Sequence, residues 1–328
     1  MLSKNVCMGW QMPVSCLDCR CKILSDVYLL MLEAVDWQRF RYLEPKNNLG
    51  RPPRYSRVAL LRGLLYKELA NLRSVSELVR ILSGDYYKMN ILGFDHLPSM
   101  STFSRFKDEV DVDRIMVILT GMIREAYPDF MAMVGVDSTS LDAHCKKDRD
   151  ADWGYDHITG ENYYGYKVHI MYDLPTLAPL CHIVTPANNH DVTQLLPLLE
   201  KMGIRVLFMR GLLADMAYDS KEKVELLYKA GISMINLVNR RNSKKETNKY
   251  RLQDYMPFHD ITMNKLYKNR MHCEYANYLL KEHLDLKRVN TTGILRTHTK
   301  TGLTLIARLI QVLYQLRQEA NPRTTIIE

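Results

Sequence analysis

The stretch that follows Pro128 limits the fold most strongly, because the pattern of the chain changes there from helical to strand-like. Five short segments rich in β-branched and aromatic residues, as strands are, lie at 131–141, 163–173, 177–186, 204–215 and 232–238. Helical segments lie at 191–203 and 220–231, and another begins near residue 266. The predicted order is therefore three strands, helix, strand, helix, strand and helix.

That order is the one found in a ribonuclease-H-like α/β fold, in which helices flank a mixed sheet. The first and fourth strands are neighbours in such a sheet. Only the polar stretch 239–258 separates the fifth strand from the last helix, so we expect no large inserted domain there.

The residues before Pro128 predict an all-helical region. Val58, Leu61, Leu65 and Leu69 repeat at helical spacing after a loop that contains two prolines. Ser74 and Glu77 have capping-box spacing, Ser101 is a candidate N-cap, and a last helix ends before Pro128. We therefore divide the chain into an irregular cysteine-containing segment (1–49), a helical DNA-binding or dimerisation domain (50–128) and an α/β domain (129–328).

Charge is distributed unevenly along the chain, whose formal net charge is +8. Residues 131–238 carry 10 Lys and Arg against 14 Asp and Glu, whereas residues 239–328 carry 17 against 8. An acidic region concentrates divalent cations, and a basic region holds a polyanion such as DNA. Many bacterial proteins are mildly basic without binding nucleic acid, so the pattern is only suggestive alone.

Cysteine usage and hydropathy indicate a cytoplasmic protein. The chain has seven cysteines, its residue pattern indicates no signal peptide, and it has no apolar run long enough for a membrane helix. The cysteines clustered near the N-terminus are Cys7, Cys16, Cys19 and Cys21. Their spacing permits a zinc site, but it is tight and no second pair follows, so free thiols are the favoured interpretation.

Four polar side chains between residues 267 and 281 share one face of a predicted helix. Tyr267, Arg270 and Lys281 lie at offsets of minus seven, minus four and plus seven from Glu274, which all fall within about 40° of its direction. Leu266, Cys273, Leu280 and Leu284 form a neighbouring apolar stripe. A solvated face with an Arg270–Glu274 pair would explain the same pattern.

Three acids are expected to converge in the folded chain. Asp137 follows an apolar run in the first strand, Asp215 ends the fourth strand, and Glu274 lies on the last helix. Three carboxylates in one cleft repel one another unless cations neutralise them, and oxygen ligands suit Mg²⁺ or Mn²⁺. We therefore predict a two-metal centre for phosphoryl transfer, with the arginine, lysine and tyrosine of the same helix holding flanking phosphates.

Other polar residues in this region have simpler explanations. The histidines at 144, 157, 169, 182 and 190 are irregularly spaced, so surface or hydrogen-bonded side chains are expected rather than metal ligands. Lys167 could contact DNA at the edge of the cleft or could simply be solvated. Asn189 and Asp191 are expected to cap the next helix, and neither Ser138 nor Ser140 has the partners of a nucleophile.

The four-residue pattern and its neighbours resemble the DDE transposases of bacterial and archaeal insertion sequences, in the group with a Tyr-Arg-Glu-Lys signature. "VGVDSTSL", "YYGYKVHI", "TPANNHD" and "LLADMAYDS" also look like blocks of that family. "GRPPRYSRVALLRGLLYKELANLRSVSEL" and "GFDHLPSMSTFSRF" are similar to the helical domain that precedes its catalytic domain. The resemblance extends from about residue 50 to the C-terminus.

The resemblance implies a reaction and its partners. Asp137, Asp215 and Glu274 would bind two Mg²⁺ ions, with Mn²⁺ as a substitute and Asp137 bridging both. Water would cut the element at its terminal inverted repeat, and the freed 3′-hydroxyl would attack target DNA. Joining two element ends calls for at least a homodimer. The protein would be associated with the nucleoid. The alternatives are a silent or host-adopted protein that only binds inverted repeats, and a repair nuclease with the same site.

Overall fold

The computed structural model describes residues 25–45, 53–156, 160–236 and 261–324. The four N-terminal cysteines, His157 and the whole polar stretch 239–258 lie outside these residues. The described chain forms two compact units, and the boundary between them falls between Val110 and Asp111. We describe each unit separately.

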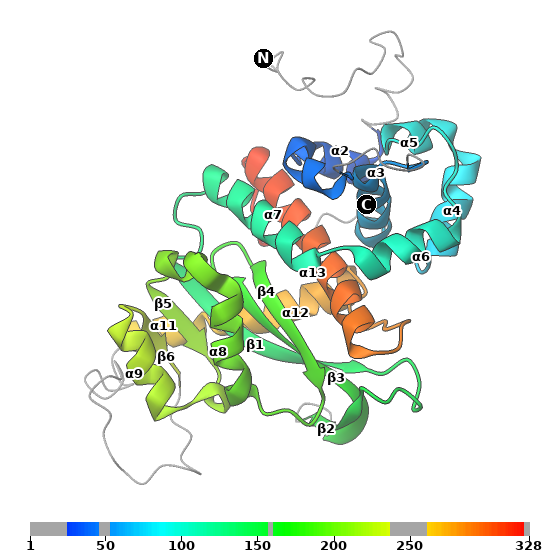
Figure 1. Cartoon of the computed structure of the whole chain (residues 1–328). Helices are drawn as coiled ribbons and strands as arrows, with labels where there is room; N and C mark the ends of the chain where they lie inside the picture. The colour runs from blue at the N-terminus through cyan, green and yellow to red at the C-terminus, as the bar shows by residue number, and fades with distance from the viewer. Residues whose placement is uncertain (1–24, 46–52, 157–159, 237–260, 325–328) are drawn as a thin grey trace. The chain divides into compact units, whose positions relative to one another are not determined.

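The first unit is all-helical over its described residues (Figure 1, blue to cyan). The sequence predicts helices from residue 50 onward, and the described part of the segment 1–49 is helical as well. Its elements are α2 (Val27–Glu33), the 3₁₀ helix η1 (Trp37–Leu43), α3 (Arg57–Leu69), α4 (Val75–Gly84), α5 (Tyr86–Ile91) and α6 (Met100–Glu109). Helix α3 lies at its centre, and Val58, Leu61, Leu65 and Leu69 are all buried. The helical repeat therefore identified this core correctly.

Two predicted helix starts have different outcomes in this unit. Ser74 caps α4, because its Oγ accepts the backbone N–H of Glu77 at 3.1 Å. Ser101 does not cap α6. Ser99 takes that role instead and accepts the N–H of Thr102 at 3.3 Å. Ser99 follows Pro98 and has extended backbone, which is the conformation of an N-cap, so the helix begins at Met100.

The second unit is built on a six-stranded mixed sheet. Its strands are β1 (Met133–Asp142), β2 (Asp152–Asp156), β3 (Glu161–Asp173), β4 (Ala178–Pro186), β5 (Gly211–Ala214) and β6 (Ser233–Ile235). Strand β3 pairs antiparallel with β1, β2 and β4, whereas β5 pairs parallel with both β1 and β6. Apart from the added β2, the order β4-β3-β1-β5-β6 is ribonuclease-H-like, and β1 and the predicted fourth strand are neighbours.

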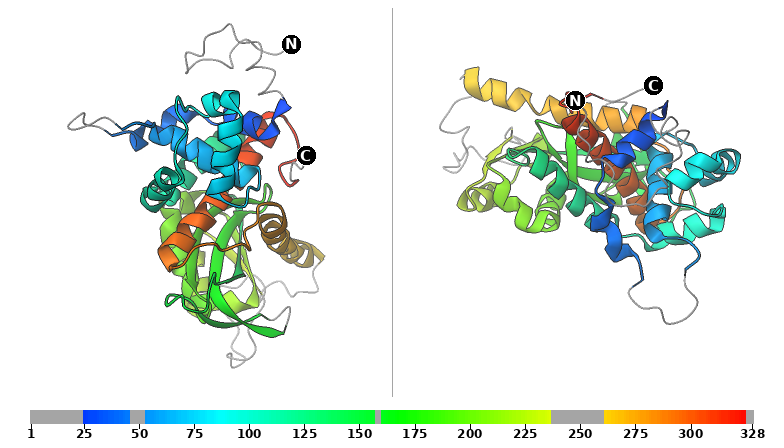
Figure 2. Two further views of the ribbon diagram at one scale, coloured as in Figure 1. Left: turned by 90° about the vertical axis from the view of Figure 1, so that its right-hand side faces the viewer. Right: turned by 90° about the horizontal axis from the view of Figure 1, so that it is seen from above.

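Helices cover both faces of this sheet (Figures 1 and 2). They are α7 (Val112–Ala126), α8 (Asp191–Met202), α9 (Lys221–Lys229), α11 (Ile261–Lys268), α12 (Met271–His283) and α13 (Ile294–Arg317). Strand β1 shows which helix faces which side: Asp137 contacts α12 through Asn277, and the next residue, Ser138, contacts Asp191 at the start of α8. Successive side chains of a strand point to opposite faces, so α12 and α8 lie on opposite sides of the sheet.

Helix α7 packs along α13 and β4 within this second unit. The sequence-based division at residue 128 places α7 with the helical region instead and stays a prediction about domain organisation. Helix α13 is long, and most of its residues are buried. No helix in the described part of the chain is long and apolar enough to cross a bilayer.

The predicted fourth strand is only partly correct. Residues 211–214 form β5, but Gly203–Phe208 form the 3₁₀ helix η2. The side chain of Arg205 explains the difference, because it donates to the carbonyls of Lys201 and Met202 at the end of α8 and to that of Leu180. These bonds hold the chain in a tight turn directly after the helix. Strand β2 was not predicted.

Candidate active site

Strands β1 and β5 position the first two acids of the candidate site. Asp137 lies within β1 and is partly buried. Val136 pairs with Ala214 at the end of the parallel β5, and Asp215 follows directly. The carboxylate of Asp215 accepts the N–H of Met216 at 2.6 Å, which fixes it at the start of the 3₁₀ helix η3 (Met216–Tyr218). Neighbouring parallel strands thus deliver both carboxylates to one region of the sheet.

Helix α12 brings the third acid to the same region. Cys273, Leu280 and Leu284 are buried, as the apolar stripe predicts. The side-chain amide of Asn277, one turn after Glu274, donates to Oδ2 of Asp137 at 2.9 Å. The helix therefore packs directly over β1, while the side chain of Glu274 remains about half exposed (52%).

The electrostatics of Asp137 show that the three acids influence one another. Burial is the main cause that raises the pKa of Asp137, to about 7, and the negative charges of Asp215 and Glu274 raise it further. The backbone N–H of Ser138 and the positive charge of Arg270 act in the opposite direction. A nearby cation would strongly stabilise the ionised form of a carboxyl group with such a pKa.

Arg270 lies among these acids. Its Nη2 contacts Oε1 of Glu274 at 2.5 Å. Partial burial lowers the pKa of Arg270, but the charges of Asp215, Glu274 and Asp137 outweigh that effect and raise it. The arginine therefore supplies positive charge to the cluster of carboxylates.

The three carboxylates are an appropriate donor set for hard divalent cations, but they do not converge on one point. Among the described residues, the group of three ligand atoms that all lie within 4.8 Å of one another belongs to Asp113, His182 and His298. Asp137, Asp215 and Glu274 form no such group. A two-ion site spreads its ligands over ions about 4 Å apart, with one acid shared between them, and oxygen donors of this kind suit Mg²⁺. The donor chemistry therefore fits a pair of such ions.

The Tyr-Arg-Glu-Lys set does not lie on one continuous helix. Tyr267 belongs to α11, Arg270 is the residue before α12, and the other two lie within α12. The chain turns at Asn269 and Arg270, where each N–H bonds a carbonyl three residues back. Arg270 still lies 5.9 Å from the ring centre of Tyr267 and bonds Glu274. Tyr267, Arg270 and Glu274 therefore stay close together although the helix is interrupted between them.

Lys281 faces a different part of the site. It is partly buried, and burial is the main cause that lowers its pKa, whereas the charges of Asp156, Asp142, Glu282 and Asp137 act to raise it. Among these charges, those of Asp156 and Asp142 have the largest effect on the pKa of Lys281, and both residues lie at the ends of strands, β2 and β1. Lys281 thus lies toward that end of the sheet.

Lys167 lies on the face of the sheet that is opposite to Asp137. Its partner in the antiparallel register is Ser140, three positions along β1 from Asp137. Its Nζ donates to the carboxylate of Asp191 at 3.0 Å and to the carbonyl of Asn189 at 3.2 Å. A DNA-binding role for Lys167 therefore stays a prediction, and the structure places it apart from the three acids.

The expected cap of α8 was wrong. His190 is the N-cap, and no side chain makes a capping hydrogen bond there. The carboxylate of Asp191 instead accepts bonds from Ser138 and Lys167, which draws it toward the sheet. His169, also on this face, is buried, and burial lowers its pKa to about 4. It bonds Thr185 and Tyr218, in line with the expectation of a hydrogen-bonded histidine.

Asn277 is a functional candidate that the sequence did not reveal. Tyr172 donates to its Oδ1 at 2.6 Å, and its Nδ2 donates to Asp137. The side chain therefore connects a buried phenol to the first acid and orients the carboxylate. Its spacing of three residues from Glu274 was the available signal, because residues three apart on a helix lie on neighbouring positions of one face.

We expect Asn277→Ala to shift the pH dependence of any reaction that needs ionised Asp137. Loss of the donor raises the pKa of that carboxyl group, so the acid limb of the activity profile should move to higher pH. The buried hydroxyl of Tyr172 also loses its partner, which should cost about 1–3 kcal/mol of stability in urea unfolding. Tyr172→Phe is the matched control, because it leaves the bond to Asp137 in place and should not shift the profile. Equal shifts in both variants would argue against an orienting role.

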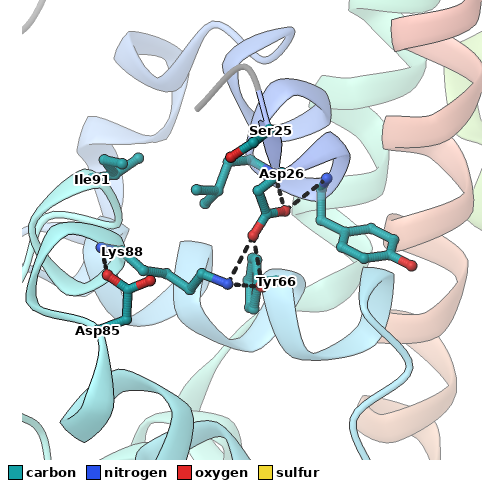
Figure 3. A pocket seen from close by; sticks show the side chains of 8 residues that line it. Ser25, Asp26, Tyr66, Asp85, Lys88 and Ile91 are labelled. Atoms are coloured by element: carbon teal, nitrogen blue, oxygen red, sulfur yellow. Dashed lines mark hydrogen bonds and ion pairs between the residues drawn. The ribbon is translucent and has the colours of Figure 1, made fainter. Parts of the chain in front are cut away.

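A cavity lies in the first unit, away from the three acids. It has a volume of about 340 Å³ and is lined by Ser25, Asp26, Tyr28, Leu29, Tyr66, Asp85, Lys88 and Ile91. Figure 3 shows Lys88, Asp26 and Tyr66 pointing toward one another; the Lys88–Asp26 ion pair is 2.8 Å long, and Tyr66 donates to Asp26 at 2.9 Å. These groups satisfy one another and tie α2, α3 and α5 together, so we assign them a structural role.

Two family models match the sequence. Residues 131–310 match the model described as "Transposase DDE domain", and residues 17–109 match a model described as "Transposase domain". No match was found among proteins of curated function.

Solved structures give distant similarities. A piggyBac transposase synaptic complex with hairpin DNA is 12% identical, covering 93% of this chain and 82% of the other, with a TM-score of 0.30. A Drosophila P element transposase strand transfer complex is 13% identical over 84% and 68% of the two chains, with a TM-score of 0.29. A pre-cleavage Mos1 transpososome is 11% identical over 84% of each chain, with a TM-score of 0.22. The fold assignment therefore rests on the strand order, not on these scores.

Proposed function

The chain belongs to the DDE transposase family, and from that premise we propose that it cuts DNA at the ends of an insertion sequence and joins them to target DNA, using Asp137, Asp215 and Glu274. The observation that carries the proposal is the environment of Asp137. The charges of Asp215 after β5 and Glu274 on α12 act together on this one partly buried carboxyl group.

The carboxylates of Asp137, Asp215 and Glu274 would hold two Mg²⁺ ions, or Mn²⁺ in their place. When bound, such ions supply Lewis-acid activation of the attacking oxygen and neutralise charge on the leaving oxygen. Asn277 would keep the Asp137 carboxylate oriented toward α12. Arg270 now contacts Glu274 and would exchange that contact for one with DNA as cations occupy the site.

The basic and aromatic side chains near the acids would hold the DNA backbone. The planar guanidinium of Arg270 can form two parallel bonds to a phosphate, and Tyr267 lies beside it. Lys281, on the same helix as Glu274, would contact a phosphate farther along the strand as a point charge. Lys167, on the opposite face, could reach DNA only if the strand wraps around the edge of the sheet.

The helical domain at 50–128 would bind the terminal inverted repeats or pair two protomers. Two element ends must be joined together, so we propose a homodimer on DNA and an association with the nucleoid. A catalytically silent copy that binds inverted repeats is the second candidate. The presence of all three acids favours an active enzyme. Short inverted repeats close to both ends of the gene would support a mobile element, and their absence would support host adoption.

Cleavage of labelled element-end DNA by the purified chain tests the proposal. We expect cleavage with Mg²⁺ or Mn²⁺ and none in chelator. Below a pH of about 7, a proton competes with the cations for Asp137, so cleavage should fall with decreasing pH and recover when Mg²⁺ is raised. Binding to the DNA without cleavage at any pH between about 6 and 9 would instead identify a silent protein. An acid limb that does not respond to Mg²⁺ would contradict the assigned role of Asp137.

A further inference from the structure

One acid and two histidines come together where α7, β4 and α13 pack against one another, in a group separate from the three catalytic acids. Asp113 lies on α7, His182 on β4 and His298 on α13. Each offers one ligand atom, and these atoms all lie within 4.8 Å of one another. The three residues are far apart in the sequence, so only the fold brings them together.

The hydrogen bonding of His182 leaves one ring nitrogen free. The ring is fully buried, and its Nε2 lies 3.2 Å from the backbone carbonyl of His298. A carbonyl only accepts, so Nε2 must carry the proton and donate. Nδ1 then keeps a lone pair, yet it is buried and has no hydrogen-bond partner. Burial lowers the pKa of His182 well below its usual value, which keeps the ring neutral. A histidine that binds a metal typically donates its other N–H in this way.

The two neighbours of His182 complete a donor set. The ring of His298 stacks on that of His182, with centres 4.1 Å apart and planes at 12°. Its Nε2 lies 3.3 Å from Oδ2 of Asp113. Burial raises the pKa of Asp113, but its bonds to His298 and Lys201 outweigh burial and keep the carboxyl group ionised. Two imidazoles and a carboxylate suit Zn²⁺, which takes nitrogen and oxygen ligands in tetrahedral geometry.

We propose that Asp113, His182 and His298 form a binding site for Zn²⁺ that is distinct from the Mg²⁺ site at the three acids. The ion would connect α7, β4 and α13 and hold the C-terminal helix against the sheet. The ammonium group of Lys201 contacts Asp113 at 2.7 Å and the carbonyl of His182 at 2.9 Å. It neutralises the carboxylate when zinc is absent and competes with the ion, so its removal should tighten zinc binding.

Metal titration of the full chain, stripped with chelator and kept in excess Mg²⁺ to occupy the catalytic acids, tests this site. Co²⁺ serves as the probe because its visible absorption reports nitrogen and oxygen ligands in a tetrahedral site. We expect about one equivalent of Co²⁺ with this spectrum, displaced by Zn²⁺. Zn²⁺ at about 100 times its Kd should raise Tm by about 5 °C or more. Lys201→Met should lower the Kd.

The variants decide where the ion binds. His298→Gln should abolish both the spectrum and the rise in Tm, whereas His144→Gln, at an exposed histidine outside the group, should retain both. Cys16→Ser with Cys19→Ser should also retain both signals, because the proposed site has no thiolate ligand. Thiolates bound to Co²⁺ would add an intense near-ultraviolet band, which we do not expect to see. Circular dichroism checks that each variant is folded. The proposal is overturned if the wild-type chain gives no spectrum, if His298→Gln leaves the signals unchanged, or if the cysteine variant removes them.

Discussion

Asp137→Asn, Asp215→Asn and Glu274→Gln should each abolish cleavage of element-end DNA, by about a thousandfold or more, while binding of the DNA stays measurable. Each substitution keeps the shape of the side chain and removes one negative charge from the group that would hold the cations. Removal of a group that acts only on the transition state lowers the rate without a matching loss of binding. Single-turnover cleavage in Mg²⁺, with DNA binding measured in parallel, checks this expectation.

The three variants should not be equally stable in the absence of metal. Asp137→Asn removes a carboxyl group that burial disfavours in its ionised form, so this variant should be at least as stable as the wild-type chain in chelator at pH 8. Glu274→Gln removes the exposed partner of Arg270, which should change stability by well under about 1 kcal/mol. Glu225→Gln, a partly exposed acid on α9 that pairs with Lys229, is the matched control and should cut normally. Undiminished cleavage by any of the three would exclude that acid from the centre.

The sequence predicted the parts of the fold that depend on local pattern and strand order. Asp137 and Asp215 could be placed near each other because the first and fourth strands of such a sheet are neighbours, and β1 and β5 do pair. The apolar stripe on α12 was equally readable, because Cys273, Leu280 and Leu284 recur at helical spacing and are buried. The first inference uses the order of the strands and the second a period of about 3.6 residues, and a single sequence displays both directly.

The features that the sequence did not predict depend on contacts between distant segments. Asn277 bonds Asp137 across 140 positions, and His298 lies beside Asp113 across 185. No periodicity connects such pairs. The 3₁₀ helix at 203–208 was missed for a related reason, because the bond from Arg205 to the carbonyl of Leu180 overrides an apolar pattern that also suits a strand. The turn between α11 and α12 was also missed.

Gly135 is a further residue whose importance only the packing shows. It lies two positions before Asp137 on β1, so both face α12. A Cβ at this position would lie 2.2 Å from Sγ of Cys273 and 2.7 Å from Cδ2 of Leu174. Cys273 precedes Glu274 on the helix and is fully buried. The absence of a side chain at Gly135 therefore allows α12 to approach the strand closely enough to place Glu274 near Asp137.

Gly135→Ala should consequently reduce both stability and activity. Overpacking of a core costs about 1–3 kcal/mol, and a displacement of Glu274 by about 1 Å can lower the rate about a hundredfold. Gly121→Ala is the matched control: nothing lies within 4 Å of its added Cβ, so within α7 it should be neutral or slightly stabilising. Equilibrium unfolding in urea and single-turnover cleavage measure the two effects.

The double variant Gly135→Ala with Cys273→Ala identifies the source of the strain. Cys273→Ala removes the sulfur that the new methyl group would meet, and the remaining neighbour, Cδ2 of Leu174, is the end of a side chain that can rotate. We therefore expect the double variant to regain most of the lost stability and activity, so that the two changes are strongly non-additive. Simple additivity would mean that the sulfur is not what excludes a side chain from position 135. Recovered stability without recovered cleavage would separate the packing of α12 from the placement of Glu274.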